Sequence, residues 1–173
     1  MITRLFYILF ISIFSLNTSA NPSPLGFELN KARIADVEQV YQITKKERNH
    51  WDGYNYYVNV RDVKLEGLTE LLVICNDDNI IQAIILTINN DKFTEFYELL
   101  SEKYKLTHSQ NPNLGNKEIR FADGSCTIIL DAPLLSFSMS LIYITDEFLT
   151  KFKGKQKEEE EEKVKKAKGK ELL

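Results

Sequence analysis

The chain has 173 residues, of which 43% are hydrophobic and 27% charged, with only seven Gly and four Pro. This composition is typical of a folded globular domain and excludes a collagen-like, disordered or multi-span membrane protein. The formal net charge is −3, so no excess of positive charge indicates nucleic-acid binding.

The N-terminal segment has the pattern of an export signal. Arg4 supplies one positive charge, an apolar run of twelve residues covers 5–16, and small residues follow up to Ala20. A membrane-spanning helix needs about 17 to 25 apolar residues. We therefore expect cleavage after Ala20 and a periplasmic or secreted mature chain, with an uncleaved anchor as the alternative. The leader is the only membrane contact that we expect, because no Cys lies near the cleavage site to carry a lipid.

The distribution of charge divides the remaining chain. Residues 21–150 carry 12 positive and 19 negative side chains, a net charge of −7, whereas residues 151–173 hold nine Lys and six Glu, a net charge of +3. The sequence thus predicts a signal peptide over 1–20, a single domain over 21–150 and a charged tail over 151–173.

The tail is expected to be a solvated helix with no fixed partner. Glu159, Glu161 and Glu162 each precede a Lys by four residues, which is the favourable order for helical ion pairs. The start of this helix is expected to dock on the domain through Phe148, Leu149 and Phe152, before Gly154 interrupts it. Binding to an acidic surface or to lipid headgroups is the alternative role for the tail.

Apolar residues at helical spacing predict two helices within the domain. A short one covers Arg33 to Gln42, and a stronger one starts from a cap at Asn90 or Asp91 and runs to Tyr104. Alternating or β-branched segments predict six strands. These strands are Tyr54–Val60, Glu70–Cys75, Ile80–Ile88, Glu118–Ala122, Ser125–Asp131 and Leu135–Ile144.

The predicted elements repeat in order, because residues 33–88 and 91–144 each give a helix followed by three strands. We expect an α+β fold with two layers, in which two helices pack on one antiparallel sheet of about six strands. Polar connections over Thr44–Asp52 and Thr107–Lys117 are expected to be loops.

Two cysteines, Cys75 and Cys126, are the candidates for a disulfide. An exported chain can form one bridge between them, which would close a loop of about 50 residues. The alternative is two separate buried thiols on strands. Neither residue has another Cys or a His nearby in sequence, so no metal site is expected.

Catalytic signatures are missing from the sequence. The two histidines, His50 and His108, lie in polar segments, and no zinc, phosphate-binding or serine-nucleophile motif occurs. Acidic Asp77 and Asp78 lack the spacing of a calcium loop. We expect no enzyme activity, no catalytic residue, no cofactor and no metal.

Aromatic residues after His50 form the best candidate for a binding site. Trp51, Tyr54 and Tyr57 are the residues we select, since aromatic side chains dominate recognition surfaces. Trp51 and Tyr57 are the stronger candidates for contacts. The alternative is that Trp51, Tyr54 and Tyr56 anchor the start of a strand in the core.

The stretch from Gly26 to Glu38 resembles the start of small exported bacterial domains, in which a Gly-containing strand leads into a helix with an acidic residue beside Val. It is similar to the SmpA/OmlA group of outer-membrane assembly lipoproteins and, more distantly, to the repeats of β-lactamase inhibitor proteins. The resemblance implies a two-layer α/β fold that binds other envelope proteins, and it transfers no functional residue.

These observations favour a non-enzymatic periplasmic or secreted adaptor that engages another envelope protein through its sheet face or the Trp51–Tyr57 region. The alternative is an inhibitor or immunity-type protein that blocks a specific enzyme, because an acidic domain suits a basic target. The sequence does not identify the partner or the oligomeric state.

Overall fold

The computed structural model describes the backbone of residues 20–170, and the side chains of this range except 159–160 and 164–170. The predicted leader over 1–20 lies outside the described residues apart from Ala20. The fold is α+β, with one antiparallel sheet of eight strands in the order β1-β2-β3-β4-β8-β7-β6-β5. The strands are β1 (Ile43–Arg48), β2 (Gly53–Val58), β3 (Leu68–Asn76), β4 (Ile81–Asn89), β5 (Lys105–Gln110), β6 (Lys117–Asp123), β7 (Cys126–Ala132) and β8 (Ser138–Thr145).

The sheet consists of two four-stranded halves that join at one seam. Each half follows a helix, α1 (Ile34–Glu38) or α2 (Phe93–Lys103), and its four strands pair in chain order. The halves meet where β4 pairs with β8, with Ala83 opposite Ile144. The predicted repeat is therefore present as one helix plus four strands, and the expectation of six strands was wrong.

Strands β1 and β5 are the two that the sequence did not predict, because their residues were assigned to polar loops. They form the two edges of the sheet, where a strand pairs on one side only. All six residues of β5 are exposed, as are most of those in β1. Because few of their side chains reach the core, neither strand carries the apolar pattern that marks the other six.

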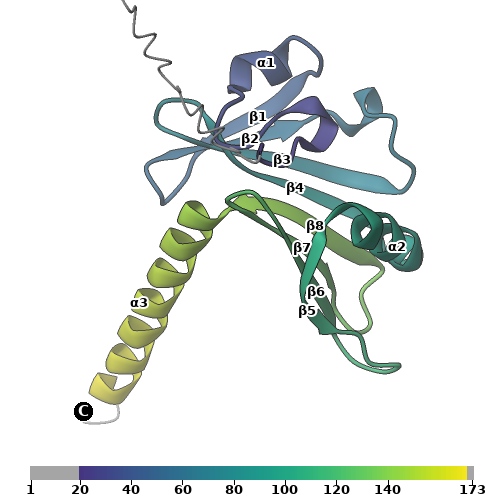
Figure 1. Ribbon diagram of the computed structural model, residues 1–173. Helices are drawn as coiled ribbons and strands as arrows, with labels where there is room; N and C mark the ends of the chain where they lie inside the picture. Colours follow the sequence, from purple (N-terminus) through teal and green to yellow (C-terminus); the bar gives the residue numbers. More distant parts are fainter. Residues whose placement is uncertain (1–19, 171–173) are drawn as a thin grey trace, which may run out of the picture.

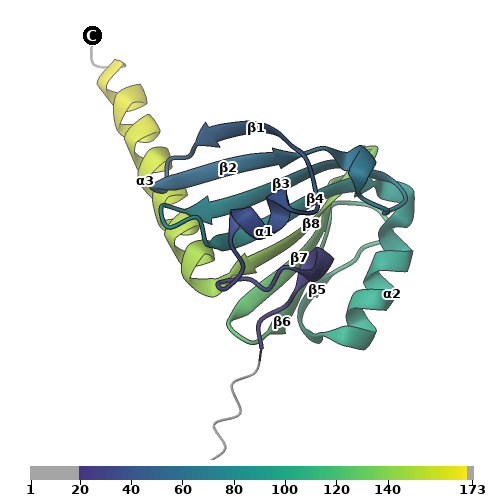
Figure 2. The same ribbon diagram turned by 90° about the horizontal axis from the view of Figure 1, so that it is seen from above.

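Helices α1 and α2 cover the same face of the sheet, and Figures 1 and 2 show both on the side opposite to α3. The core under them joins apolar side chains from both helices, the N-terminal segment and the inward-facing positions of both halves. Predicted helix contacts Phe93 and Leu100 are buried there. Helix α1 is shorter than predicted and ends at Glu38, because Val40 lies on the surface instead of facing the core.

The last helix, α3 (Asp146–Lys170), starts directly after β8 and leaves the sheet at one end of the molecule (Figure 1). Its first turns pack on the second face of the sheet, where Phe148 is buried against Ile74, Ala83 and Ile144. The predicted interruption at Gly154 was wrong, since the helix continues through it. Neighbouring Lys, Gln and Glu residues are good helix formers, and one Gly costs only about 1 kcal/mol in a helix interior. No helix in residues 20–170 is both long enough and apolar enough to span a membrane.

Candidate functional site

The three aromatic residues selected from the sequence lie in different environments. Tyr54 and Tyr57 are both on β2, but their register places them on opposite faces of the sheet. Tyr54 packs beside Tyr56 on the helix-covered face, and the Nζ atom of Lys46 lies 4.1 Å from the centroid of its ring. Tyr57 faces the other side. The structure therefore does not bring Trp51, Tyr54 and Tyr57 together in one patch.

Trp51 lies at the tip of the β1–β2 hairpin and packs against α3. Its ring centroid is 5.8 Å from that of Phe148 and 5.2 Å from that of Phe152. Lys151 Nζ donates a 3.0 Å hydrogen bond to the carbonyl oxygen of Trp51, and Lys155 Nζ donates to the carbonyl oxygen of His50. Trp51 is therefore half-buried as the contact between hairpin and tail helix.

Tyr57 belongs to a charged cluster at the edge of the second face. Its hydroxyl donates a 3.1 Å hydrogen bond to Glu47 Oε2, and Lys45 Nζ lies 2.5 Å from Glu47 Oε1. The hydrogen bond to Glu47 raises the pKa of Tyr57, while the hydrogen bond from Lys45 lowers the pKa of Glu47. Both effects keep the phenol protonated and the carboxylate charged, so Tyr57 presents a fixed hydroxyl and ring at this edge.

The two cysteines do not form a disulfide, so the possible bridge between Cys75 and Cys126 was wrong. Both thiols are free and buried. Cys75 lies on β3 and Cys126 on β7, with β4 and β8 between them, so their strands are three spacings of about 4.8 Å apart. A bridge requires Cα atoms within about 7 Å. Desolvation by burial raises the pKa of each thiol to about 12, and both therefore act as core side chains.

The histidines are also far apart in the sheet. His50 lies in the β1–β2 loop at one edge, and His108 lies on β5 at the other edge. Within residues 20–170, no group of three or more His, Cys, Asp or Glu side chains is arranged to hold a metal ion.

A row of side chains with an aliphatic centre crosses the second face of the sheet, which α1 and α2 leave uncovered. The start of α3 packs on one end of this face, and we call the part that no helix covers the open face. Register pairings place one residue from each of six neighbouring strands in this central row, and all six side chains are half-buried. The row runs through Tyr57, Leu72, Ile85, Ile142, Ile129 and Arg120.

Acidic residues flank the central row one register step further along the strands. The neighbouring row of paired residues crosses four strands. It starts at Glu70, continues through Thr87 and Ser140, and ends at Asp131. Glu118 follows Asp131 on β6, and it accepts a 2.7 Å hydrogen bond from Arg120 Nε. Partial burial, together with repulsion from Glu118, raises the pKa of Asp131. The open face therefore combines an aliphatic centre with a largely acidic border.

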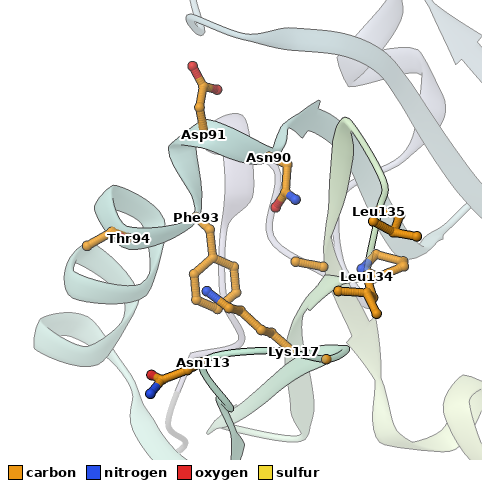
Figure 3. A pocket seen from close by; sticks show the side chains of 11 residues that line it. Asn90, Asp91, Phe93, Thr94, Asn113, Lys117, Leu134 and Leu135 are labelled. Atoms are coloured by element: carbon orange, nitrogen blue, oxygen red, sulfur yellow. The ribbon is translucent and has the colours of Figure 1, made fainter.

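A second uncovered surface lies at the opposite end of the strands from Trp51. There the β5–β6 loop (residues 111–116) and the β7–β8 loop (residues 133–137) meet the start of α2; we call these two loops the loop end. They border a cavity of about 230 Å³. Figure 3 shows Lys117 crossing this cavity, and its Nζ lies 4.6 Å from the centroid of the Phe93 ring.

The loop end was missed by the sequence analysis, which assigned Leu135 and Phe137 to a strand. Continuing the alternation of Met139 and Leu141 backwards placed Phe137 on the core side. In the structure β8 begins at Ser138, and Phe137 is 96% exposed. The signal available in the sequence was Pro133, which marks a turn at this point.

Compared with protein-family models, curated proteins and solved structures, the chain gives no match. The resemblance to the SmpA/OmlA group and to β-lactamase inhibitor proteins therefore remains an expectation from the sequence, and the fold and surfaces described above are the basis for any assignment of function.

Proposed function

We propose that this chain is a non-enzymatic adaptor of the periplasm or cell exterior, which engages another envelope protein through the open face of its sheet. The observation that carries the proposal is the central row. Leu72, Ile85 and Ile142 pack beside the cluster under the start of α3, and Ile129 follows on β7, yet each keeps part of its surface exposed. Aliphatic side chains that are contiguous and partly exposed are typical of the centre of an interaction surface.

The size and charge of the open face support a protein partner. Seven strand spacings and about six residues of strand length give roughly 34 Å by 20 Å, or about 700 Å², for the whole second face, part of which the start of α3 covers. Each partner in a standard protein interface contributes about 800 Å². The acidic border formed by Glu70, Asp131 and Glu118 favours a partner whose contact surface is apolar in the middle and basic around it.

Site-specific photo-cross-linking in intact cells of the source organism tests the proposal. A photoreactive phenylalanine analogue replaces Tyr57 or Ile129 on the open face, and in the control it replaces the exposed Glu98 on α2. We expect the same covalent adduct from positions 57 and 129 and none from position 98. The adduct from position 57 should fall at least tenfold with Ile129→Glu, but not with Leu99→Glu on the helix side.

Two outcomes would reject the open face as the binding site. One is the absence of adducts from positions 57 and 129, and the other is an equal yield from position 98. Circular dichroism spectra and melting temperatures of the variants show whether a lost adduct reflects lost folding.

An inhibitor of a specific enzyme is the second candidate, and the net charge of −7 over residues 21–150 favours it. Identification of the cross-linked partner by mass spectrometry separates the two. If the partner is an enzyme and the purified chain blocks its activity at equimolar concentration, the protein is an inhibitor and the adaptor function is rejected.

A further inference from the structure

Large hydrophobic side chains that are exposed gather at the loop end. Four of the seven large hydrophobic side chains that are exposed belong to its two loops. Leu135 is 91% exposed and Phe137 96%, and Leu114 on the neighbouring loop is 82% exposed. Exposure of this degree requires that the side chains project from the surface, so no neighbouring part of the chain within residues 20–170 shelters them.

Hydrogen bonds fix both loops in place. The backbone nitrogen of Leu134 donates to Asn116 Oδ1 at 2.8 Å, which joins the two loops. Asn90 anchors the β7–β8 loop, since its Nδ2 donates to the carbonyl oxygen of Ser136 and its backbone nitrogen to that of Phe137. Leu135 has a φ of 62°, a strained conformation for a residue with a branched side chain. The apolar side chains are therefore held outward by an ordered and locally strained backbone.

The loops also lack charge, although 27% of the chain is charged. Residues 111–116 and 132–142 contain no Asp, Glu, Lys or Arg. The nearest charged residues along the chain on the inner sides are Lys117, just after the first segment, and Asp131, just before the second. Lys117 lies at the base of the loops, where its Nζ lies over Phe93 and no carboxylate pairs with it within the described residues. Asp91 also lines the cavity, but its carboxylate points away from Lys117 (Figure 3).

We propose that the loop end is a peripheral membrane-attachment site, which inserts Leu114, Leu135 and Phe137 into the interface of a phospholipid bilayer. Projecting side chains suit a fluid surface, which adapts to them, whereas a protein partner would have to supply a matching recess. Uncharged loops enter the headgroup region without burying a charge. The ammonium group of Lys117 is placed to meet anionic headgroups. This proposal does not depend on the open face.

Vesicle binding tests the proposal directly, with residues 21–173 as the protein because every described helix and strand lies within them. The vesicles contain phosphatidylethanolamine and phosphatidylglycerol at 3:1, and binding is measured by co-sedimentation. We expect Leu135→Ser combined with Phe137→Ser to lower the partition coefficient at least tenfold. The matched control is Val40→Ser combined with Leu99→Ser, which removes two exposed apolar side chains elsewhere and should change it less than twofold.

Tryptophan fluorescence checks the orientation on the membrane. Phe137→Trp should shift its emission to shorter wavelength when vesicles are added, over a constant signal from Trp51 at the other end of the strands. Three outcomes would overturn the proposal: no sedimentation of the unsubstituted chain, an equal loss in the Val40/Leu99 control, or no emission shift. Self-association that the Leu135/Phe137 variant abolishes, without vesicle binding, would instead assign the surface to a second copy of the chain.

Discussion

The indole ring of Trp51 packs edge-to-face against the phenyl ring of Phe148, with the two ring planes at 81° and the ring centroids 5.8 Å apart. These residues lie almost 100 positions apart, one at a hairpin tip and the other in the first turn of α3. Lys151 strengthens the same junction, because it contacts the carbonyl oxygen of Trp51 and lies 3.8 Å from a carboxylate oxygen of Asp52. The junction fixes the start of the tail helix to the first half of the sheet.

Replacing Trp51 with Ala should destabilise the protein by about 2 kcal/mol, since a half-buried indole loses its contacts with Phe148 and Phe152. Trp51→Phe should cost less, because an aromatic ring remains. Urea unfolding followed by circular dichroism measures both. Unchanged stability in Trp51→Ala would mean that the ring contributes nothing to the fold and would restore Trp51 as a candidate contact for a partner.

Deletion of residues 156–173 should change the melting temperature by less than about 2 °C, because the apolar contacts of α3 with the sheet and hairpin are made by Phe148, Leu149 and Phe152. Phe148→Ala, in contrast, should cost about 3 kcal/mol, since this side chain is buried. Differential scanning calorimetry of the two variants compares them. A drop of many degrees on deletion would show that the distal helix also packs on the domain.

Both cysteines should be free thiols that react only after unfolding. Without reductant, the native protein should react slowly with a thiol reagent such as dithiobis-nitrobenzoate, because both sulfur atoms are buried and their pKa is raised to about 12. The same protein in guanidinium chloride should release two equivalents. Release of fewer than two would indicate a bridge that the sheet order does not allow within one chain.

The raised thiol pKa values also predict how stability depends on pH. In the unfolded chain a thiol loses its proton near pH 9, whereas Cys75 and Cys126 keep theirs in the folded protein up to about pH 12. Between these limits the unfolded state binds fewer protons, so the free energy of unfolding falls as the pH rises, by at most about 1.4 kcal/mol per pH unit for each thiol. Urea unfolding from pH 8 to 10.5 should give a shallower fall for Cys75→Ala combined with Cys126→Ala.

Two glycines should respond to alanine in opposite ways. A Cβ atom at Gly53 would lie 2.0 Å from the carbonyl oxygen of Cys75 on the neighbouring strand, so Gly53→Ala must displace backbone and should destabilise by more than 2 kcal/mol. A Cβ atom at Gly154 would have no other atom within 4 Å. Gly154→Ala should therefore stabilise the helical state of α3 by about 0.5 to 1 kcal/mol. Thermal unfolding tests the first and helical ellipticity the second.

Sequence patterns identified the elements that bury one face and missed those that bury none. Strand β4 and helix α2 carry aliphatic or aromatic residues at the period of their structure, and both were predicted close to their observed limits. Edge strands β1 and β5 are held by backbone pairing with one neighbour, which leaves no trace in side-chain hydrophobicity.

The candidate surfaces were only partly within reach of the sequence. Tyr57 was selected and lies at one end of the central row, but the row itself depends on register across six strands, which no local pattern contains. At the loop end, the exposure of Phe137 follows from the left-handed conformation of Leu135, which reverses the direction that the alternation predicted.

The seam between β4 and β8 has a consequence for synthesis of the chain. Six of the nine residues of β4 are aliphatic, and the residues of β8 that pair with it follow about 50 to 60 positions later. During translation, the completed first half therefore exposes an apolar strand edge at β4, whose backbone groups stay unpaired until β8 has been synthesised up to Thr145. A nascent chain in this condition is prone to aggregate with its copies, and pairing of β8 with β4 removes this exposed strand edge.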